Sequence, residues 1–232
     1  MEILVCLKQV PDTEAEIRPT ADNTDINYEG VKFVVNVYDE YAVEEALKLK
    51  EKAGEGTITI VTLGPDRAVE SIRTGLAMGA DKAVHLDDPA LLGADAYATA
   101  KALAKAIEGM SYDLIFCGMR AIDDDSFQVG HILGEFLGLP SVMGIVKFEL
   151  SGDKKKATVH RQIEDGVEVL EVPLPAAADG WLQSPSRAGR QAACTPMRRG
   201  RWLSFLGRRR CSTPLFSRAS MPSPSISWLR VK

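Results

Sequence analysis

Four short apolar runs without helical periodicity are spaced along the first half of the chain. They cover residues 3–7, 57–64, 83–86 and 113–118. Continuous apolar runs of this length are typical of parallel strands that are covered on both faces. Three stretches with helical periodicity separate the runs, at residues 38–54, 65–80 and 95–109. Strands that alternate with helices predict right-handed βαβ units and an open, mainly parallel sheet.

The pattern changes after residue 140. Residues 141–150 and 157–174 alternate apolar and polar positions, and Asp165-Gly166 gives the second stretch a hairpin turn. We therefore predict extra antiparallel strands, at one edge of the sheet or in a small lobe. The predicted fold class is α/β.

Length and composition fit one α/β domain with a small attachment, since the chain has 232 residues and is 45% hydrophobic. No apolar run reaches the roughly 20 residues of a membrane helix, and the N-terminus has no signal-peptide pattern. We expect a cytoplasmic protein without membrane insertion. The four cysteines show no disulfide or metal-ligand spacing, and Cys6 and Cys117 lie in apolar runs, as expected of buried strand residues.

The composition changes near residue 176. From Ala176 onward the chain has ten Arg and one Lys against a single acid, whereas the preceding part favours Lys over Arg by twelve to five. We divide the chain into a domain of residues 1–176 and an atypical basic tail of residues 177–232. Such a tail can be an arm for nucleic acid or anionic membrane, or a disordered extension. We favour a third interpretation, translation in a wrong reading frame, and expect no nucleic-acid partner.

Residues 117–138 carry the strongest signal for chemistry. The segment leaves an apolar run at Gly118, crosses three consecutive aspartates and enters an apolar-periodic helix. With Ser126 as the helix cap, the backbone amides of about residues 127–130 can hold a phosphate. Alternatively, Asp123, Asp124 and Asp125 are ordinary capping acids. This loop and the one at residues 8–12 leave predicted strand ends, where ligands bind in open α/β sheets.

Other familiar sites are absent from the sequence. It has no GxGxxG after the first strand, no GxxxxGK[ST] and no GxSxG, and its three histidines lack partners at catalytic or metal spacing. These absences exclude a Rossmann fingerprint, a P-loop and a hydrolase elbow.

The string AIDDDSFQVGHI at 121–132 resembles the adenine-nucleotide loop of electron-transfer flavoprotein β subunits. LVCLKQVPD at 4–12 and the segments 34–52, 62–86 and 170–176 fall in the order and spacing of the same family. The resemblance implies an adenine nucleotide α-hydrolase-like (HUP) three-layer fold with a structural AMP. It also implies a heterodimer with an α subunit that holds FAD, which carries electrons from dehydrogenases to a quinone oxidoreductase or another acceptor. The chain would then be an electron-carrier subunit and not an enzyme.

The resemblance also transfers the nucleotide contacts. Cys6 would line the adenosine pocket, residues 36–39 would face the base and ribose, Leu63 would contribute backbone, and residues 121–132 would wrap the ribose and phosphate. The expected cofactor-binding residues are Cys6, Asn36, Val37, Tyr38, Asp39, Leu63, Ala121, Ile122, Asp123, Asp124, Asp125, Ser126, Phe127, Gln128, Val129, Gly130, His131 and Ile132. We expect no catalytic and no metal-ligating residue.

The sequence also bears on three other functions. Electron-bifurcating relatives carry a second FAD in the pocket and have Gly and Thr where this chain has Asp124 and Ser126. Asp124 fills space that the larger cofactor would need, so we favour AMP. A stand-alone nucleotide-binding stress-type protein would show GxxGxxxxxxxxG(S/T) after the fourth strand, and an ATP pyrophosphatase would show SGGxDS after the first. The resemblance ends near residue 176, before the segments with which the family docks onto its partners.

Overall fold

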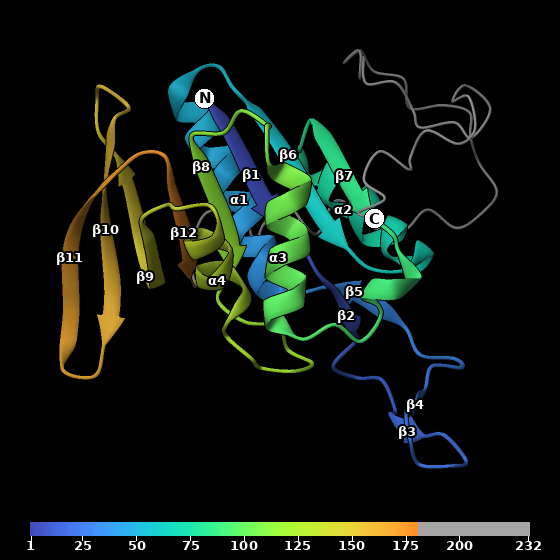
Figure 1. The fold of residues 1–232 in the computed structure, drawn as a ribbon. Helices are drawn as coiled ribbons and strands as arrows, with labels where there is room; N and C mark the ends of the chain where they lie inside the picture. The colour runs from blue at the N-terminus through green and yellow to red at the C-terminus, as the bar shows by residue number, and fades with distance from the viewer. Residues whose placement is uncertain (181–232) are drawn as a thin grey trace, which may run out of the picture. The chain divides into compact units, whose positions relative to one another are not determined.

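The computed structural model describes residues 1–180, which form an α/β domain around an eight-stranded sheet (Figure 1). The strand order is β11-β10-β9-β12-β8-β1-β6-β7. The strands of this sheet are β1 (Glu2–Cys6), β6 (Thr57–Leu63), β7 (Lys82–Leu86), β8 (Leu114–Gly118), β9 (Ser141–Leu150), β10 (Lys156–Ile163), β11 (Gly166–Pro173) and β12 (Ala176–Gly180). The helices are α1 (Val37–Ala53), α2 (Val69–Met78), α3 (Ala96–Ile107) and α4 (Val129–Phe136), with 3-10 turns η1 (Asp66–Ala68) and η2 (Pro89–Leu91).

The sheet is mainly parallel. Strands β9, β12, β8, β1, β6 and β7 are parallel to one another, whereas β10 pairs antiparallel with both β9 and β11. From β1 the chain proceeds to β6 and β7 on one side, and it then crosses to β8 on the other side. The predicted parallel sheet and its antiparallel extension are confirmed, and the strand order reverses between β1 and β8.

Helices cover both faces of the parallel part (Figure 1). Ile3 and Val5 of β1 pack into a cluster with residues of α1, whereas Leu4 packs into a second cluster with residues of α3. This alternation follows from the two-residue side-chain period of a strand. The predicted three-layer arrangement is therefore confirmed.

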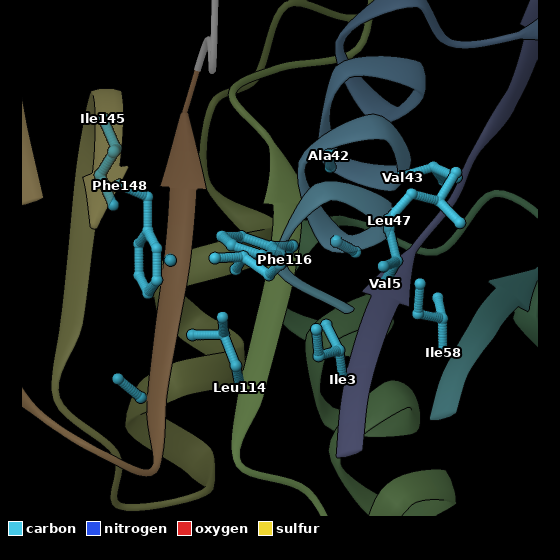
Figure 2. Close-up of a cluster of buried hydrophobic side chains, with 14 of the residues drawn as sticks. Ile3, Val5, Ala42, Val43, Leu47, Ile58, Leu114, Phe116, Ile145 and Phe148 are labelled. Carbon is cyan, nitrogen blue, oxygen red and sulfur yellow. The ribbon is translucent and has the colours of Figure 1, made fainter. Parts of the chain in front are cut away.

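The cluster under α1 continues across the sheet to the antiparallel strands (Figure 2). Phe116 of β8 and Phe148 of β9 meet edge to face with ring centroids 5.3 Å apart, although β12 lies between their strands in the sheet order. They reach each other over β12 because Ala176 and Ala178, which belong to the same cluster, have small side chains. Bulky residues on β8 and β9 thus fill the space above a strand of alanines.

Strand β12 crosses the domain boundary expected at residue 176. All five of its residues are buried, and they pair with β8 on one side and β9 on the other. The other face of β12 packs against α4. A Cβ built at Gly134 would lie 3.2 Å from Ala177 Cβ, and one built at Gly130 would lie 2.6 Å from Asp179 Oδ2. The sheet therefore continues to Gly180.

A second difference from prediction is the excursion between β1 and α1. Four short strands pair antiparallel within it, β2 (Gln9–Pro11) with β5 (Phe33–Val35) and β3 (Arg18–Pro19) with β4 (Ile26–Asn27). The predictions for the remainder of the basic tail concern residues outside the described range. Within residues 1–180, no helix has the length and apolar character needed to cross a membrane.

Candidate functional site

The fold brings the sequence-predicted nucleotide residues to one edge of the sheet, at the carboxyl ends of the parallel strands. Cys6 ends β1 and Leu63 ends β6, while residues 36–39 form the N-terminal end of α1. Residues 121–132 connect β8 to the first turn of α4 and include that turn. This edge contains the reversal of strand order between β1 and β8, where open α/β sheets bind ligands.

Asp39 connects the two central strands at this edge. Its side chain is buried, and its Oδ2 accepts a hydrogen bond from the Lys8 backbone N–H at 2.7 Å while Oδ1 accepts one from the Gly118 N–H at 3.2 Å. Burial raises the pKa of Asp39 to about 7, although the Lys8 and Gly118 N–H groups act in the opposite direction. A Cβ on Gly118 would lie 2.2 Å from Asp39 Oδ1, so this close contact requires glycine.

Asn36 holds the loop that follows β8. The residue is 1% exposed, its Nδ2 donates to the Arg120 carbonyl at 2.9 Å, and its Oδ1 accepts from the Ile122 N–H at 3.3 Å. Asn36 precedes α1 but makes no side-chain cap bond to it. The side chains of Asn36 and Asp39, expected to face a base and ribose, thus position the loops around the site.

The acidic triplet is paired with basic side chains. Lys8 Nζ lies 2.8 Å from Asp123 Oδ1 and 3.0 Å from Asp124 Oδ2, and an Arg120 guanidinium nitrogen lies 2.9 Å from Asp125 Oδ2. Burial opposes the charge of Lys8, but the bonds and charges of Asp123 and Asp124 outweigh it and raise the Lys8 pKa. These pairs reduce the negative charge of the loop, so an acidic loop can border a phosphate site.

The prediction that Ser126 caps the following helix is wrong. Helix α4 begins at Val129, with Gln128 as an N-cap that makes no side-chain cap bond. Asp125 and Phe127 both have φ of 53°, a left-handed backbone that turns the loop before the helix can start. The Ser126 N–H instead donates to Asp124 Oδ1 at 3.1 Å. The first-turn amides available for an anion are therefore those of residues 129–131.

Asp179 is a buried acid beside this helix that sequence reasoning missed as a site residue. It is 2% exposed, and its Oδ2 lies 3.8 Å from His131 Nδ1. Among the described residues, neither Asp179 Oδ1 nor His131 Nδ1 has a hydrogen-bond partner. Burial raises the Asp179 pKa to about 7, while a hydrogen bond from the Gly144 N–H acts against this rise. The available signal was an acid directly after three alanines in AAADG.

Lys8, Gly118 and Arg120 were also absent from the predicted site. Gly118 ends β8 and Lys8 lies two residues after the end of β1, so their positions at the reversal of strand order were the available signal. Arg120 follows Gly118 by two residues, and its Nε donates to the Tyr38 hydroxyl at 3.2 Å. These three residues join the loop to β1 and α1.

A shallow hollow lies elsewhere, between α1 and β9. It has a volume of about 300 Å³ and includes none of the predicted nucleotide residues. Its lining residues are Glu45, Lys48, Leu49, Lys52, Val146, Lys147, Phe148 and Glu149. In the described part of the chain, no three His, Cys, Asp or Glu side chains are grouped as metal ligands.

Comparisons with known proteins show the family to which the chain belongs. A family model described as the electron transfer flavoprotein domain matches residues 25–178. An "electron transfer flavoprotein subunit beta" of Thermoanaerobacterium thermosaccharolyticum is 48% identical over 175 residues, which are 75% of this chain and 66% of that protein. The subunit beta of Syntrophomonas wolfei is 41% identical over 198 residues, 83% of this chain and 76% of that protein.

A third relative is the "Caffeyl-CoA reductase-Etf complex subunit CarD" of Acetobacterium woodii, 44% identical over 177 residues that cover 75% of this chain and 66% of that protein. The chain thus spans about two thirds of the length of these relatives: 66% of the Thermoanaerobacterium protein and 76% of the Syntrophomonas protein. The matching domain and the aligned subunits agree with one another, and the chain therefore belongs to the electron transfer flavoprotein family, as a relative of its beta subunits.

Proposed function

We propose that this chain is the β subunit of a heterodimeric electron-transfer flavoprotein and that it binds AMP at the carboxyl edge of its sheet. The observation that carries the proposal is the meeting of three segments at the reversal of strand order: the end of β1, the start of α1 and the loop 119–128. Asp39 and Asn36 hold these segments together in a chain that is similar to β subunits of electron-transfer flavoproteins.

Several features of the edge fit an adenine nucleotide. The amides of residues 129–131 open α4 and suit a phosphate, and the absence of a Cβ at Gly118 lets the start of α1 pack against the end of β8. Lys8 and Arg120 reduce the charge of the acidic triplet. Asp179 opposes an anion here when it is ionised, but its raised pKa keeps a substantial neutral fraction near pH 7. The nucleotide would bind at this edge and stabilise the loops, with no bond made or broken.

AMP is favoured over a second FAD by the position of Asp124. Its carboxylate bonds both to Lys8 Nζ on the β1 side and to the Ser126 N–H within its own loop. Burial opposes its ionisation, but the Ser126 N–H and Lys8 outweigh this effect and lower the Asp124 pKa. The ionised side chain thus ties the loop to Lys8, and we expect a loop held in this way to leave less space for a dinucleotide than for AMP.

The electron-carrying role would need a second chain. We propose an FAD-holding α subunit as the partner, with dehydrogenases as donors and a quinone oxidoreductase or another acceptor as the recipient of electrons. The flavin would supply the redox chemistry, and this chain would contribute its nucleotide site to the heterodimer. On its own the chain would carry out no reaction.

Acid release and chromatography of the nucleotide bound to the purified full chain would test the proposal. We expect close to one AMP per chain. If close to one FAD per chain is found, the second-flavin alternative replaces the assignment of AMP. If the chain binds ATP and turns it over, the proposed role as an electron carrier is wrong. Asp124→Gly should shift the bound fraction from AMP towards FAD, whereas Asp87→Asn, on an exposed residue before η2, should leave it unchanged.

Co-expression with an FAD-holding α subunit tests the partner. We expect both chains to elute together in size-exclusion chromatography with flavin absorbance. Elution of this chain alone, with AMP still bound, would refute heterodimer formation by this polypeptide while leaving its nucleotide site intact.

A further inference from the structure

Two cysteines lie side by side on the central strands of the sheet. Strands β1 and β8 are parallel neighbours, and their register pairs Leu4 with Ile115 and Val5 with Phe116. The next pair in this register is Cys6 and Cys117. Adjacent strands are about 4.8 Å apart, which falls within the usual range of about 4.4–6.8 Å between the Cα atoms of a disulfide.

Both side chains point to the same side of the sheet. Cys117 belongs to the buried cluster under α3 and α4, and Cys6 packs against that cluster. This agrees with the geometry of parallel strands, in which residues at matching positions share a face. Both cysteines are free thiols in the structure. The backbone therefore presents the two sulfur atoms to each other.

The two thiols differ in access, and the environment of Cys117 opposes its ionisation. Cys6 is partly exposed at the nucleotide edge, whereas Cys117 is 6% exposed. The hydrogen bond with Cys6, burial, and the nearby carboxyls of Asp179 and Asp39 raise the pKa of Cys117. Since the thiolate is the reactive form, Cys6 is the thiol that an oxidant in solution reaches first, and Cys117 is placed to react with the product.

We propose that Cys6 and Cys117 are a peroxide-sensitive dithiol that closes to a reversible disulfide. The Cys6 thiolate attacks one peroxide oxygen, the O–O bond breaks, and the departing hydroxide takes a proton to become water. The Cys117 sulfur then attacks the Cys6 sulfenic acid, and the hydroxyl leaves with the Cys117 proton as a second water. Two thiols lose two electrons in total, and hydrogen peroxide is reduced to two waters. A dithiol reductant reverses the bond.

The disulfide would close at a sensitive point of the fold. Cys6 precedes Lys8 by two residues and Cys117 precedes Gly118, and the backbone N–H groups of Lys8 and Gly118 are the two donors to Asp39. The disulfide would therefore constrain the two strand ends from which the loops of the candidate site begin. This inference goes beyond the proposed function, because the disulfide requires neither a nucleotide nor a partner subunit.

The test uses the full chain with Cys194→Ser and Cys211→Ser, which leaves the two strand cysteines. The protein is treated with hydrogen peroxide, its remaining thiols are alkylated, and it is digested with trypsin. We expect a linked pair of peptides, residues 1–8 with residues 106–120, which dithiothreitol separates. Because the fold holds the sulfurs together, linkage should be at least about tenfold faster in the native protein than in guanidinium.

Two outcomes overturn the proposal. One is complete alkylation of both cysteines, or conversion of Cys6 to sulfinic acid, without the linked peptides. The other is linkage that is no faster in the native protein than in the unfolded one. In Cys117→Ser, dimedone should trap a persistent Cys6 sulfenic acid, and labelling elsewhere would contradict the assigned order. The linked-peptide measurement does not use Cys117→Ser, so it decides the matter even if that variant fails to fold.

Discussion

Replacing Asp179 by Asn tests what the buried carboxyl does to stability. Asp179 lies in β12 against the first turn of α4 and is 2% exposed. Asn has nearly the same shape and keeps an oxygen that can accept from the Gly144 N–H, but it cannot ionise. The substitution therefore removes the charge and retains the packing.

The expected effect depends on pH. Burial raises the Asp179 pKa from 3.8 to about 7, which corresponds to about 4 kcal/mol between its two protonation states. Between these values the folded chain keeps a proton that the unfolded chain releases. The free energy of unfolding must then fall as the pH rises through this window. Asp179→Asn should thus match the original chain near pH 4 and exceed its stability by up to about 4 kcal/mol at pH 8.

Urea unfolding of both full-length proteins from about pH 4 to 8 would measure this difference. Burial also raises the pKa of Asp39 to about 7, so Asp39 lowers the free energy of unfolding of both proteins in the same pH window. This contribution cancels when one stability curve is subtracted from the other. Asp87→Asn serves as the control on an exposed aspartate and should give a small difference without this rise. A difference between Asp179→Asn and the original chain that stays constant with pH would refute the reasoning.

Three further predictions concern the site and the core. Gly118→Ala should lower the free energy of unfolding by about 2 kcal/mol or more and reduce the amount of bound AMP, because the new Cβ would meet Asp39. The control Gly152→Ala adds a Cβ in open space and should change the free energy of unfolding by no more than about 0.5 kcal/mol. Chemical denaturation would measure both values. Phe116→Ala should lower the free energy of unfolding by about 3–5 kcal/mol in the same assay. Phe136→Ala should lower it clearly less, because Phe136 is 38% exposed. Equal losses in the two variants would contradict the assigned core. A chain ended after Gly180 should keep a cooperative melt by circular dichroism, and one that lacks β12 should lose it; a melt without β12 would show that the strand is dispensable.

The sequence predicted the parallel core well because hydrophobic patterning was strong there. The run at 57–64 became β6 (Thr57–Leu63), and the periodic stretch at 38–54 became α1 (Val37–Ala53). Strand β12 was missed because alanine, aspartate and glycine have low strand propensity. It forms because small side chains fit between α4 and the bulky residues around Phe116 and Phe148. That requirement depends on tertiary packing and has no local signal.

The candidate site was located from topology, but its internal contacts were not predictable. Loops at the ends of central strands gave the correct edge of the sheet. Asn36 and Asp39, however, bond to residues 86 and 79 positions away in sequence, and such pairings have no periodic pattern. The helix cap was misplaced because nothing local signalled that Phe127, a non-glycine residue, would take a left-handed backbone.

The central place of β12 also sets the order in which the molecule can be assembled during synthesis. Its neighbours β8 and β9 end at Gly118 and Leu150, so both are made before residues 176–180 emerge from the ribosome. Until then, β8 and β9 each have an unpaired edge, and α4 lacks the surface on which Gly130 and Gly134 rest. The loop before α4 can therefore adopt its final conformation only after the last described strand has been synthesised, although that loop was translated some fifty residues earlier.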